Sequence, residues 1–105
     1  MTQVRYSQRA LADLDGIGYH FARVAGIDVA VTAISKIRTV IQRRIVRFPN
    51  AGRLRPEFGW GIRSYPSPPY IIFYVTDPSG IEIIRVLHGH RDLQAPLMSL
   101  LVQPA

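Results

Sequence analysis

The sequence contains no cysteine, which excludes disulfide bonds and thiolate chemistry and fits a reducing compartment. It also lacks any apolar run close to the ~20 residues that a membrane-spanning helix needs, and its N-terminus has no apolar signal core. Internal repeats, low-complexity tracts and linkers are missing as well. We therefore expect a cytoplasmic protein with no membrane partner, built as one domain over residues 1–105, in which residues 92–105 form a C-terminal tail.

Acidic residues are scarce, and the chain is strongly basic, with a net charge of +6 and an isoelectric point near 10.5. Twelve of the 13 basic residues are arginine, and residues 36–63 hold eight basic residues against one acid. Arginine binds phosphates and carboxylates in bidentate geometry and stacks on flat rings. This stretch indicates a nucleic acid or an acidic protein as partner, although a solvated helix face followed by a basic loop has the same composition.

Apolar residues in the first half recur at the spacing of two helices. After a short extended segment at residues 4–6, Ser7 is expected to cap a first helix that ends at Gly26. Asp28 is expected to cap a second helix, which Pro49 stops. The apolar stripes are Ala10, Leu14, Ile17, Phe21 and Val24 in the first helix and Ala30, Ile34, Ile37, Ile41, Ile45 and Phe48 in the second. Together they predict a helical hairpin.

The second half has the pattern of strands. Residues 50–61 are expected to be a loop, residues 62–65 a short strand that Pro66 interrupts, and residues 70–75 a central strand buried on both faces. Residues 77–80 predict a turn, which returns the chain as a hairpin over residues 81–87. The order β-α-α-β-β-β predicts an α+β fold of two layers, in which the N-terminal helical hairpin packs on one face of a small antiparallel sheet.

Strand alternation places Ile81, Ile83, Arg85 and Leu87 on one face of the last strand, and Glu82, Ile84 and Val86 on the other. Both sets are largely apolar, so neither suits bare solvent. The sheet face away from the helices should therefore be covered, either by the chain's own tail or by a segment of a partner.

Polar residues gather directly after this strand. His88, His90 and Asp92 could supply metal ligands, but Gly89 is typical of a turn, and few other ligand-type residues are available. We therefore expect no metal site and no cofactor. Arg85 is expected to pair with an acid such as Glu57 or Asp92.

A nuclease that works without metal would need a general base, a general acid and cations around the scissile phosphate. His88 or His90 could serve with Arg85, Arg91 and Arg63, but residues 70–75 carry no cation. The tail after Arg91 has no Lys, Arg, His or Tyr to complete a site. We therefore expect a protein without catalytic residues, and ribonuclease activity is the alternative.

Three segments resemble the ParE branch of the ParE/RelE toxin superfamily, and together they cover residues 4–93. The first strand and helix are matched by Tyr6-Ser7-x-x-Ala10-x-x-Asp13-Leu14-x-x-Ile17, and the loop after the second helix by Phe48-Pro49-x-x-Gly52-Arg53. The closing hairpin is matched by Pro69-Tyr70-x-x-x-Tyr74 with Ile83-x-Arg85-Val86-Leu87-His88-Gly89-x-Arg91-Asp92, which is the most specific part.

The resemblance implies the toxin of a type II toxin–antitoxin pair, which forms a hetero-oligomer with a ParD-like antitoxin. Such an antitoxin has a DNA-binding N-terminus and an acidic C-terminal segment that folds on the toxin, so the toxin meets DNA only indirectly. ParE-type members are implied to inhibit DNA gyrase without catalysis, whereas RelE-type members cleave mRNA on the ribosome. Tyr70, Ile71 and Ile72 occupy the stretch in which the RelE pattern expects an arginine. Gyrase inhibition is therefore favoured, with mRNA cleavage or a loss of toxicity as alternatives.

The expected site residues form two groups. Antitoxin contacts are expected at Arg63, Tyr70, Ile83, Ile84 and Arg85. Target contacts are expected at His88, His90 and Arg91, which follow the last strand and can reach outward.

Overall fold

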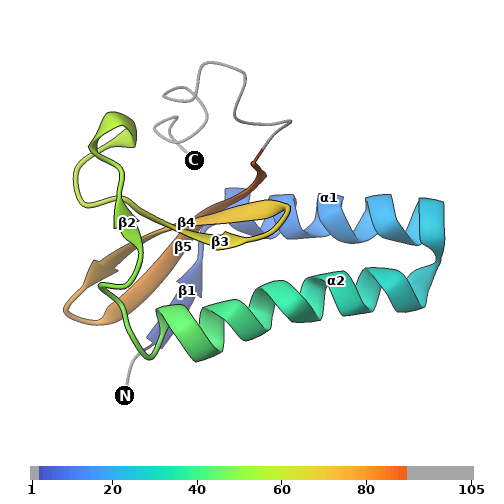
Figure 1. Cartoon of the computed structure of the whole chain (residues 1–105), viewed down its shortest axis with the longest axis horizontal. Helices are drawn as coiled ribbons and strands as arrows, with labels where there is room; N and C mark the ends of the chain where they lie inside the picture. The colour runs from blue at the N-terminus through green and yellow to red at the C-terminus, as the bar shows by residue number, and fades with distance from the viewer. Residues whose placement is uncertain (1–2, 90–105) are drawn as a thin grey trace.

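The computed structural model describes residues 3–89 and shows a helical hairpin on a five-stranded sheet (Figure 1). The strands are β1 (Gln3–Tyr6), β2 (Arg53–Leu54), β3 (Arg63–Ser67), β4 (Tyr70–Asp77) and β5 (Gly80–His88). The helices are α1 (Gln8–Ala25) and α2 (Ile27–Val40), which continues into the π-helical turn η1 (Ile41–Ile45), and a 3₁₀ turn η2 (Pro56–Phe58) follows β2. The predicted α+β class and its two layers are confirmed. None of the helices in residues 3–89 is long and apolar enough to cross a membrane.

The strand order is β1-β5-β4-β3-β2, so the predicted central strand is indeed central. β1 runs parallel to β5, with Tyr6 opposite Ile83, whereas all other neighbours are antiparallel. The prediction of a wholly antiparallel sheet is wrong at this edge. A hairpin turn dictates antiparallel pairing only between consecutive strands. Both helices and three strands separate β1 from β5, so no turn sets their relative direction.

Helix α1 begins and ends at its predicted positions. Helix α2 begins two residues earlier than predicted, and its continuation η1 ends at Ile45, before the predicted stop at Pro49. The Ser7 hydroxyl accepts a 3.0 Å hydrogen bond from the Ala10 N–H and caps α1. Gly26, at φ 98°, ends α1 and is also the first residue outside α2. The prediction that Asp28 caps α2 is therefore wrong, because one glycine with a positive φ turns the chain two residues earlier. Asp28 lies instead in the first turn, where its charge suits the helix dipole.

The third strand is longer than predicted, because Pro66 lies inside β3 and does not interrupt it. β2 pairs only with Arg63 and Ser64, so Pro66 lies on a stretch that has a neighbouring strand on one side alone. A missing N–H is tolerated on such an edge. The predicted turn between β4 and β5 is confirmed, and the Asp77 carboxylate accepts hydrogen bonds from the Ser79 and Gly80 N–H groups.

The main core lies between the helices and the sheet. It consists of buried side chains from both layers: Ala10, Leu14, Ile17, Ile37, Ile41, Ile45, Tyr70, Ile72, Tyr74, Ile81, Ile83 and Val86. A smaller cluster lies on the other face, where Phe58 and Ile62 pack on Phe73 and Leu87. The loop between β2 and β3 thus supplies part of the cover that we expected from the tail or a partner.

A β-bulge in β5 changes which residues face the helices. Tyr74 lies opposite Ile83, but Phe73 lies opposite Arg85, so Ile84 is an extra residue between them. The strand alternation reverses at this point. Val86 therefore packs among the helices and Leu87 on the other face, contrary to the predicted alternation.

Candidate functional site

A buried ion pair joins α1 to the end of β5. The Arg85 Nε donates to Asp13 Oδ2 at 2.8 Å, and its Nη2 donates to Asp13 Oδ1 at 2.9 Å. Only 10% of the Arg85 side chain and 14% of the Asp13 side chain are exposed. Pairing of Arg85 with an acid was predicted, but the partner Asp13 was not named. Glu57 pairs instead with Arg55 at 2.9 Å, and Asp92 lies outside the described residues.

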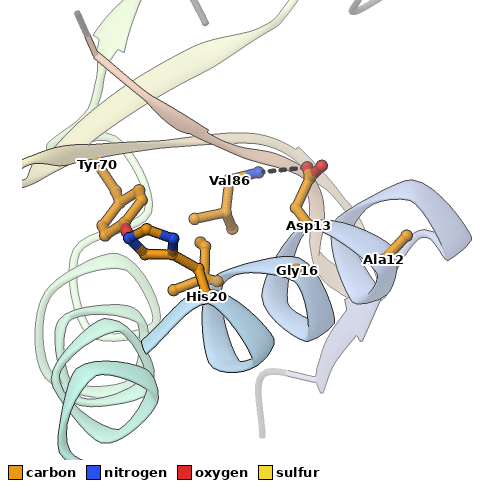
Figure 2. A pocket seen from close by; sticks show the side chains of 7 residues that line it. Ala12, Asp13, Gly16, His20, Tyr70 and Val86 are labelled. Atoms are coloured by element: carbon orange, nitrogen blue, oxygen red, sulfur yellow. Dashed lines mark hydrogen bonds between the residues drawn. The ribbon is translucent and has the colours of Figure 1, made fainter. Parts of the chain in front are cut away.

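Side chains of α1 complete the edge of β5 where β1 ends. The Ser7 N–H donates to the Ile83 carbonyl at 2.9 Å, and the Ser7 hydroxyl donates to the Ile84 carbonyl at 2.7 Å. Asp13 Oδ2 accepts from the Val86 N–H at 2.9 Å, as the dashed line in Figure 2 shows. Buried backbone groups need such partners. Ser7 and Asp13 therefore have a structural role in addition to their places in the helix.

A pocket of about 260 Å³ lies beside this ion pair. Its lining residues come from α1 and from the ends of β4 and β5: Ala12, Asp13, Gly16, Ile17, His20, Tyr70 and Val86. In Figure 2, His20 projects from α1 toward Tyr70. On the strand side the Tyr70 ring meets the His88 ring edge to face, with centroids 5.7 Å apart. The pocket thus contains one imidazole and one phenol, and the imidazole of His88, where a target contact was expected, packs against that phenol.

The cation beside this pocket that could hold a phosphate, Arg85, already forms an ion pair with Asp13. Arg85 is the one cation on β4 and β5, and both of its bonds to Asp13 are charge-assisted. Within residues 3–89, no group of three His, Asp or Glu side chains is placed to hold a metal ion. The described part of the pocket can therefore donate and accept protons but offers no free cation.

The structure separates the expected antitoxin contacts into buried and accessible residues. Tyr70, Ile83 and Arg85 are buried and face α1 or the core, and of these three Tyr70 also lines the pocket. Ile84 is half-buried on the opposite sheet face. Arg63 is partly exposed, and its guanidinium donates to the Asn50 and Gly52 carbonyls at 3.2 and 2.8 Å.

Of the expected target contacts, the structure describes one. His88 is partly exposed at the end of β5. His90 and Arg91 lie outside the described residues, and so does Asp92.

Four arginines between α2 and β3 are exposed, and no ion-pair partner for them occurs in the described chain: Arg43, Arg44, Arg47 and Arg53. Arg55 differs, because it pairs with Glu57 and lies 4.7 Å from the Phe58 ring centroid. The basic stretch found in the sequence therefore places positive charge on the surface of the molecule. Large apolar side chains, Phe48, Leu54 and Trp60, are exposed in the same stretch. The prediction that Phe48 continues the apolar stripe of the second helix is wrong, because the helix ends at Ile45.

A second apolar surface follows the helical hairpin. Tyr19 on α1 and Ile27, Val31 and Ile34 on α2 line a groove of about 520 Å³, which also includes Gly18. Tyr19, Ile27 and Val31 are largely exposed. Apolar periodicity alone could not reveal this groove, because Ile27 and Val31 lie outside the stripe that marks the buried face of α2.

Comparison with known proteins places these features in a family. The family model described as "ParE toxin of type II toxin-antitoxin system, parDE" matches residues 4–93. The chain belongs to the ParE toxin family. The match covers the same residues as the resemblance found in the sequence. The family is one of toxins of type II toxin–antitoxin systems.

Curated relatives and a solved structure agree with this assignment. Toxin ParE3 of Caulobacter vibrioides is 28% identical over 97 residues, which cover 92% of this chain and 96% of the relative. Toxin ParE1 of the same organism is 31% identical over 97 residues, which cover 92% and 99%. A solved structure, described as the chromosomal ParDE TA system from P. aeruginosa, shares the fold with a TM-score of 0.72. Its identity is 24%, and the match covers 84% of this chain and 96% of that one.

Proposed function

We propose that this ParE-family chain acts in the cytoplasm, where a ParD-like antitoxin with an acidic C-terminal segment neutralises it. When free, it inhibits DNA gyrase without catalysis of its own. The proposal is supported most directly by the Asp13–Arg85 ion pair. This pair occupies the only cation on the two longest strands, and a metal-independent nuclease needs such a cation to stabilise the charged transition state.

The surface chemistry supports an antitoxin partner. Exposed arginines favour an acidic segment, and the hairpin groove with Tyr19 and Val31 favours an apolar one. Of the residues first expected to contact the antitoxin, Ile84 and Arg63 remain accessible. Tyr70, Ile83 and Arg85 are buried, so substitutions there would lower the stability of the fold rather than remove a direct contact with the antitoxin.

The target contacts that we propose are His88, His90 and Arg91. His88 stands at the end of β5 beside the pocket, and the other two follow it within three residues. Polar groups at the end of a rigid strand are well placed to meet a large protein target.

A supercoiling assay with purified gyrase tests the target. The free chain should inhibit supercoiling and accumulate cleaved DNA, and addition of the antitoxin should relieve both effects. His88→Ala and Arg91→Ala should weaken inhibition while the far-UV spectrum and thermal unfolding stay unchanged. Arg23→Ala, at the far end of α1, is the matched control and should inhibit normally. Full gyrase activity at saturating chain would contradict the proposal.

One observation favours ribosome-dependent mRNA cleavage as the second candidate. His20 and Tyr70 line one pocket, the His88 ring packs against the Tyr70 ring, and these groups can act as general acids and bases. The test uses ribosomes carrying a defined message. We expect the message to remain intact, and site-specific cuts that disappear in His88→Ala would decide for the nuclease.

A further inference from the structure

Trp60 is the most exposed large apolar side chain of the described residues, with 99% of its surface accessible. It is also the only tryptophan in the chain. Gly59 at φ 143° and Gly61 at φ 75° flank it in the loop between β2 and β3, at the end of the molecule opposite the α1–α2 turn (Figure 1). An indole is usually largely buried. Full exposure between two glycines gives no packing to this chain, which points to a role in contact with another molecule.

Trp60 forms one wall of a pocket, which we call the Trp60 notch. Its other lining residues are Leu54, Pro56, Gly61, Arg63 and Thr76, and its volume is about 450 Å³. Leu54 is 53% exposed and lies on the short edge strand β2. The notch therefore combines three apolar side chains with one cation, at a size that suits one or two side chains of a partner.

Arg63 supplies the positive charge of the Trp60 notch. Leu54 pairs with Arg63 in the sheet, whereas Arg53 pairs with Ser64, so Arg53 is exposed on the opposite face of β2. Arg47 lies earlier in the same basic stretch and is also exposed. The acid of this stretch, Glu57, is held by Arg55, which lowers the pKa of its carboxyl through their hydrogen bond. The surface around the notch is thus complementary to an acidic partner.

We propose that the Trp60 notch binds an acidic polypeptide segment, with an apolar side chain packed on Trp60 and Leu54 and a carboxylate beside Arg63. The partner is the acidic segment of the antitoxin, and for that identity the inference rests on the proposed function. Tryptophan and arginine are the residue types that contribute most at protein interfaces. The apolar walls formed by Leu54 and Pro56 favour a peptide side chain over a phosphate backbone, which would leave them without a partner.

The single tryptophan allows a direct test, because the full chain can be produced with fluorinated tryptophan and followed by fluorine NMR. Random peptides displayed on phage are selected on the full chain, and the selected peptides are then titrated. Acidic peptides with an aliphatic or aromatic residue should be enriched and should shift the Trp60 resonance. Neutral or basic peptides, or acidic ones that leave the resonance unchanged, would overturn the proposal. So would a shift caused by single-stranded oligothymidylate but by none of the peptides, because it would assign the notch to nucleic acid.

Variants separate the notch from general charge attraction. Trp60→Ala and Leu54→Ala should each weaken binding of the selected peptides by about tenfold or more, which corresponds to a hot-spot contact. Both side chains are exposed, so folding should not change. Val24→Ala and Arg23→Gln, in the last turns of α1, are matched controls and should bind normally. Equal losses in the controls would contradict a defined notch.

Addition of the antitoxin to the fluorinated chain tests the identity of the partner. The Trp60 resonance should shift, and the shift should be lost when the antitoxin's acidic segment is deleted. If peptides occupy the notch but the antitoxin does not, the named partner is wrong. Neither measurement involves gyrase, so failure of the inference is distinguishable from failure of the proposed function.

Discussion

At the scale of single residues, Asp13 makes more interactions than any other carboxylate of the described chain apart from Asp77. It binds Arg85 through both oxygens and accepts the Val86 N–H. Asp13→Ala would remove both oxygens that bind the buried Arg85 guanidinium and the acceptor of the Val86 N–H, and breaking a buried ion pair typically costs about 3–5 kcal/mol of folding free energy. Urea unfolding should therefore show a large loss of stability in this variant.

The control for this prediction is Arg5→Ala, which breaks the more exposed Arg5–Asp77 ion pair. Exposed pairs contribute little, so its unfolding midpoint should move far less. Similar losses in both variants would mean that burial of the Asp13–Arg85 pair has no special importance.

Tyr74 is a second residue whose buried polar group can be tested. Its hydroxyl donates to the Pro49 carbonyl and accepts from the Gly52 N–H, both at 2.9 Å. Tyr74→Phe leaves those two backbone groups without their partner, at a cost of about 1–3 kcal/mol. Chemical unfolding at neutral pH measures this loss, and Tyr19→Phe on the exposed face of α1 should cost nothing.

The same hydroxyl predicts a dependence of stability on pH. Burial raises the pKa of Tyr74 above its usual value, so the folded chain keeps this proton while the unfolded chain releases it near pH ~10. The contribution is complete below that pH and is lost as the pH rises toward the folded-state pKa. The free energy of unfolding should therefore decline above pH ~10, less steeply in Tyr74→Phe. Identical slopes in the two proteins would rule out Tyr74 as the source.

Prediction from sequence succeeded at the residue scale where the chemistry is local. Ser7 was identified as a helix cap because the hydroxyl and the N–H it binds are three residues apart. That Arg85 pairs with an acid was also foreseeable, since buried guanidinium groups need a counter-charge. Its partner Asp13 lies 72 residues away, and Arg85 lies directly after the extra residue of a bulge that interrupts the strand alternation. Neither feature has a local signal in the sequence.

At the scale of elements, Gly80 connects the β4–β5 turn to the parallel edge strand. It lies opposite Gln3 with φ 146°, and a Cβ at this position would collide with the Gln3 carbonyl oxygen. Gly80→Ala should therefore detach β1 from β5. Hydrogen exchange of the β1 amides should accelerate, and the unfolding free energy should fall by more than the ~1–3 kcal/mol expected for backbone strain alone.

Gly61→Ala separates the two effects. Gly61 also has a positive φ, 75°, but no atom lies within 4 Å of a Cβ built there. This variant should lose stability through strain alone and should keep the exchange pattern of β1. If the two variants behaved alike, the close contact with Gln3 would not explain why position 80 requires a glycine.

The elements themselves differ in how far the sequence predicts them. α1 and α2 follow from apolar spacing, and β4 from its continuous apolar run. β2 and the cover formed by Phe58 and Ile62 were not predicted, because two residues are too few for a periodic signal. Such short segments are positioned by tertiary contacts with the sheet.

At the scale of the whole molecule, the charge distribution predicts how the antitoxin associates. The net charge is +6, and Arg43, Arg44, Arg47 and Arg53 are exposed without acid partners in the described chain. Opposite charges accelerate association, and salt screens the attraction over about 10 Å at 0.1 M. The association rate constant should therefore fall strongly as ionic strength rises, whereas the dissociation rate constant should change little.

Two variants assign these rate effects to different surfaces. Arg47→Gln removes an exposed charge, so association should be slower and its dependence on salt weaker, while dissociation stays the same. Ile84→Asp places a carboxylate on the half-buried second sheet face, where burial of an unpaired charge is costly. The Ile84→Asp variant should either dissociate faster from the antitoxin or be less stable itself. Thermal unfolding of the free chain distinguishes these two outcomes. Surface plasmon resonance over a range of salt concentrations measures both rate constants. An association rate that does not change with salt would show that apolar contacts alone bring the two proteins together.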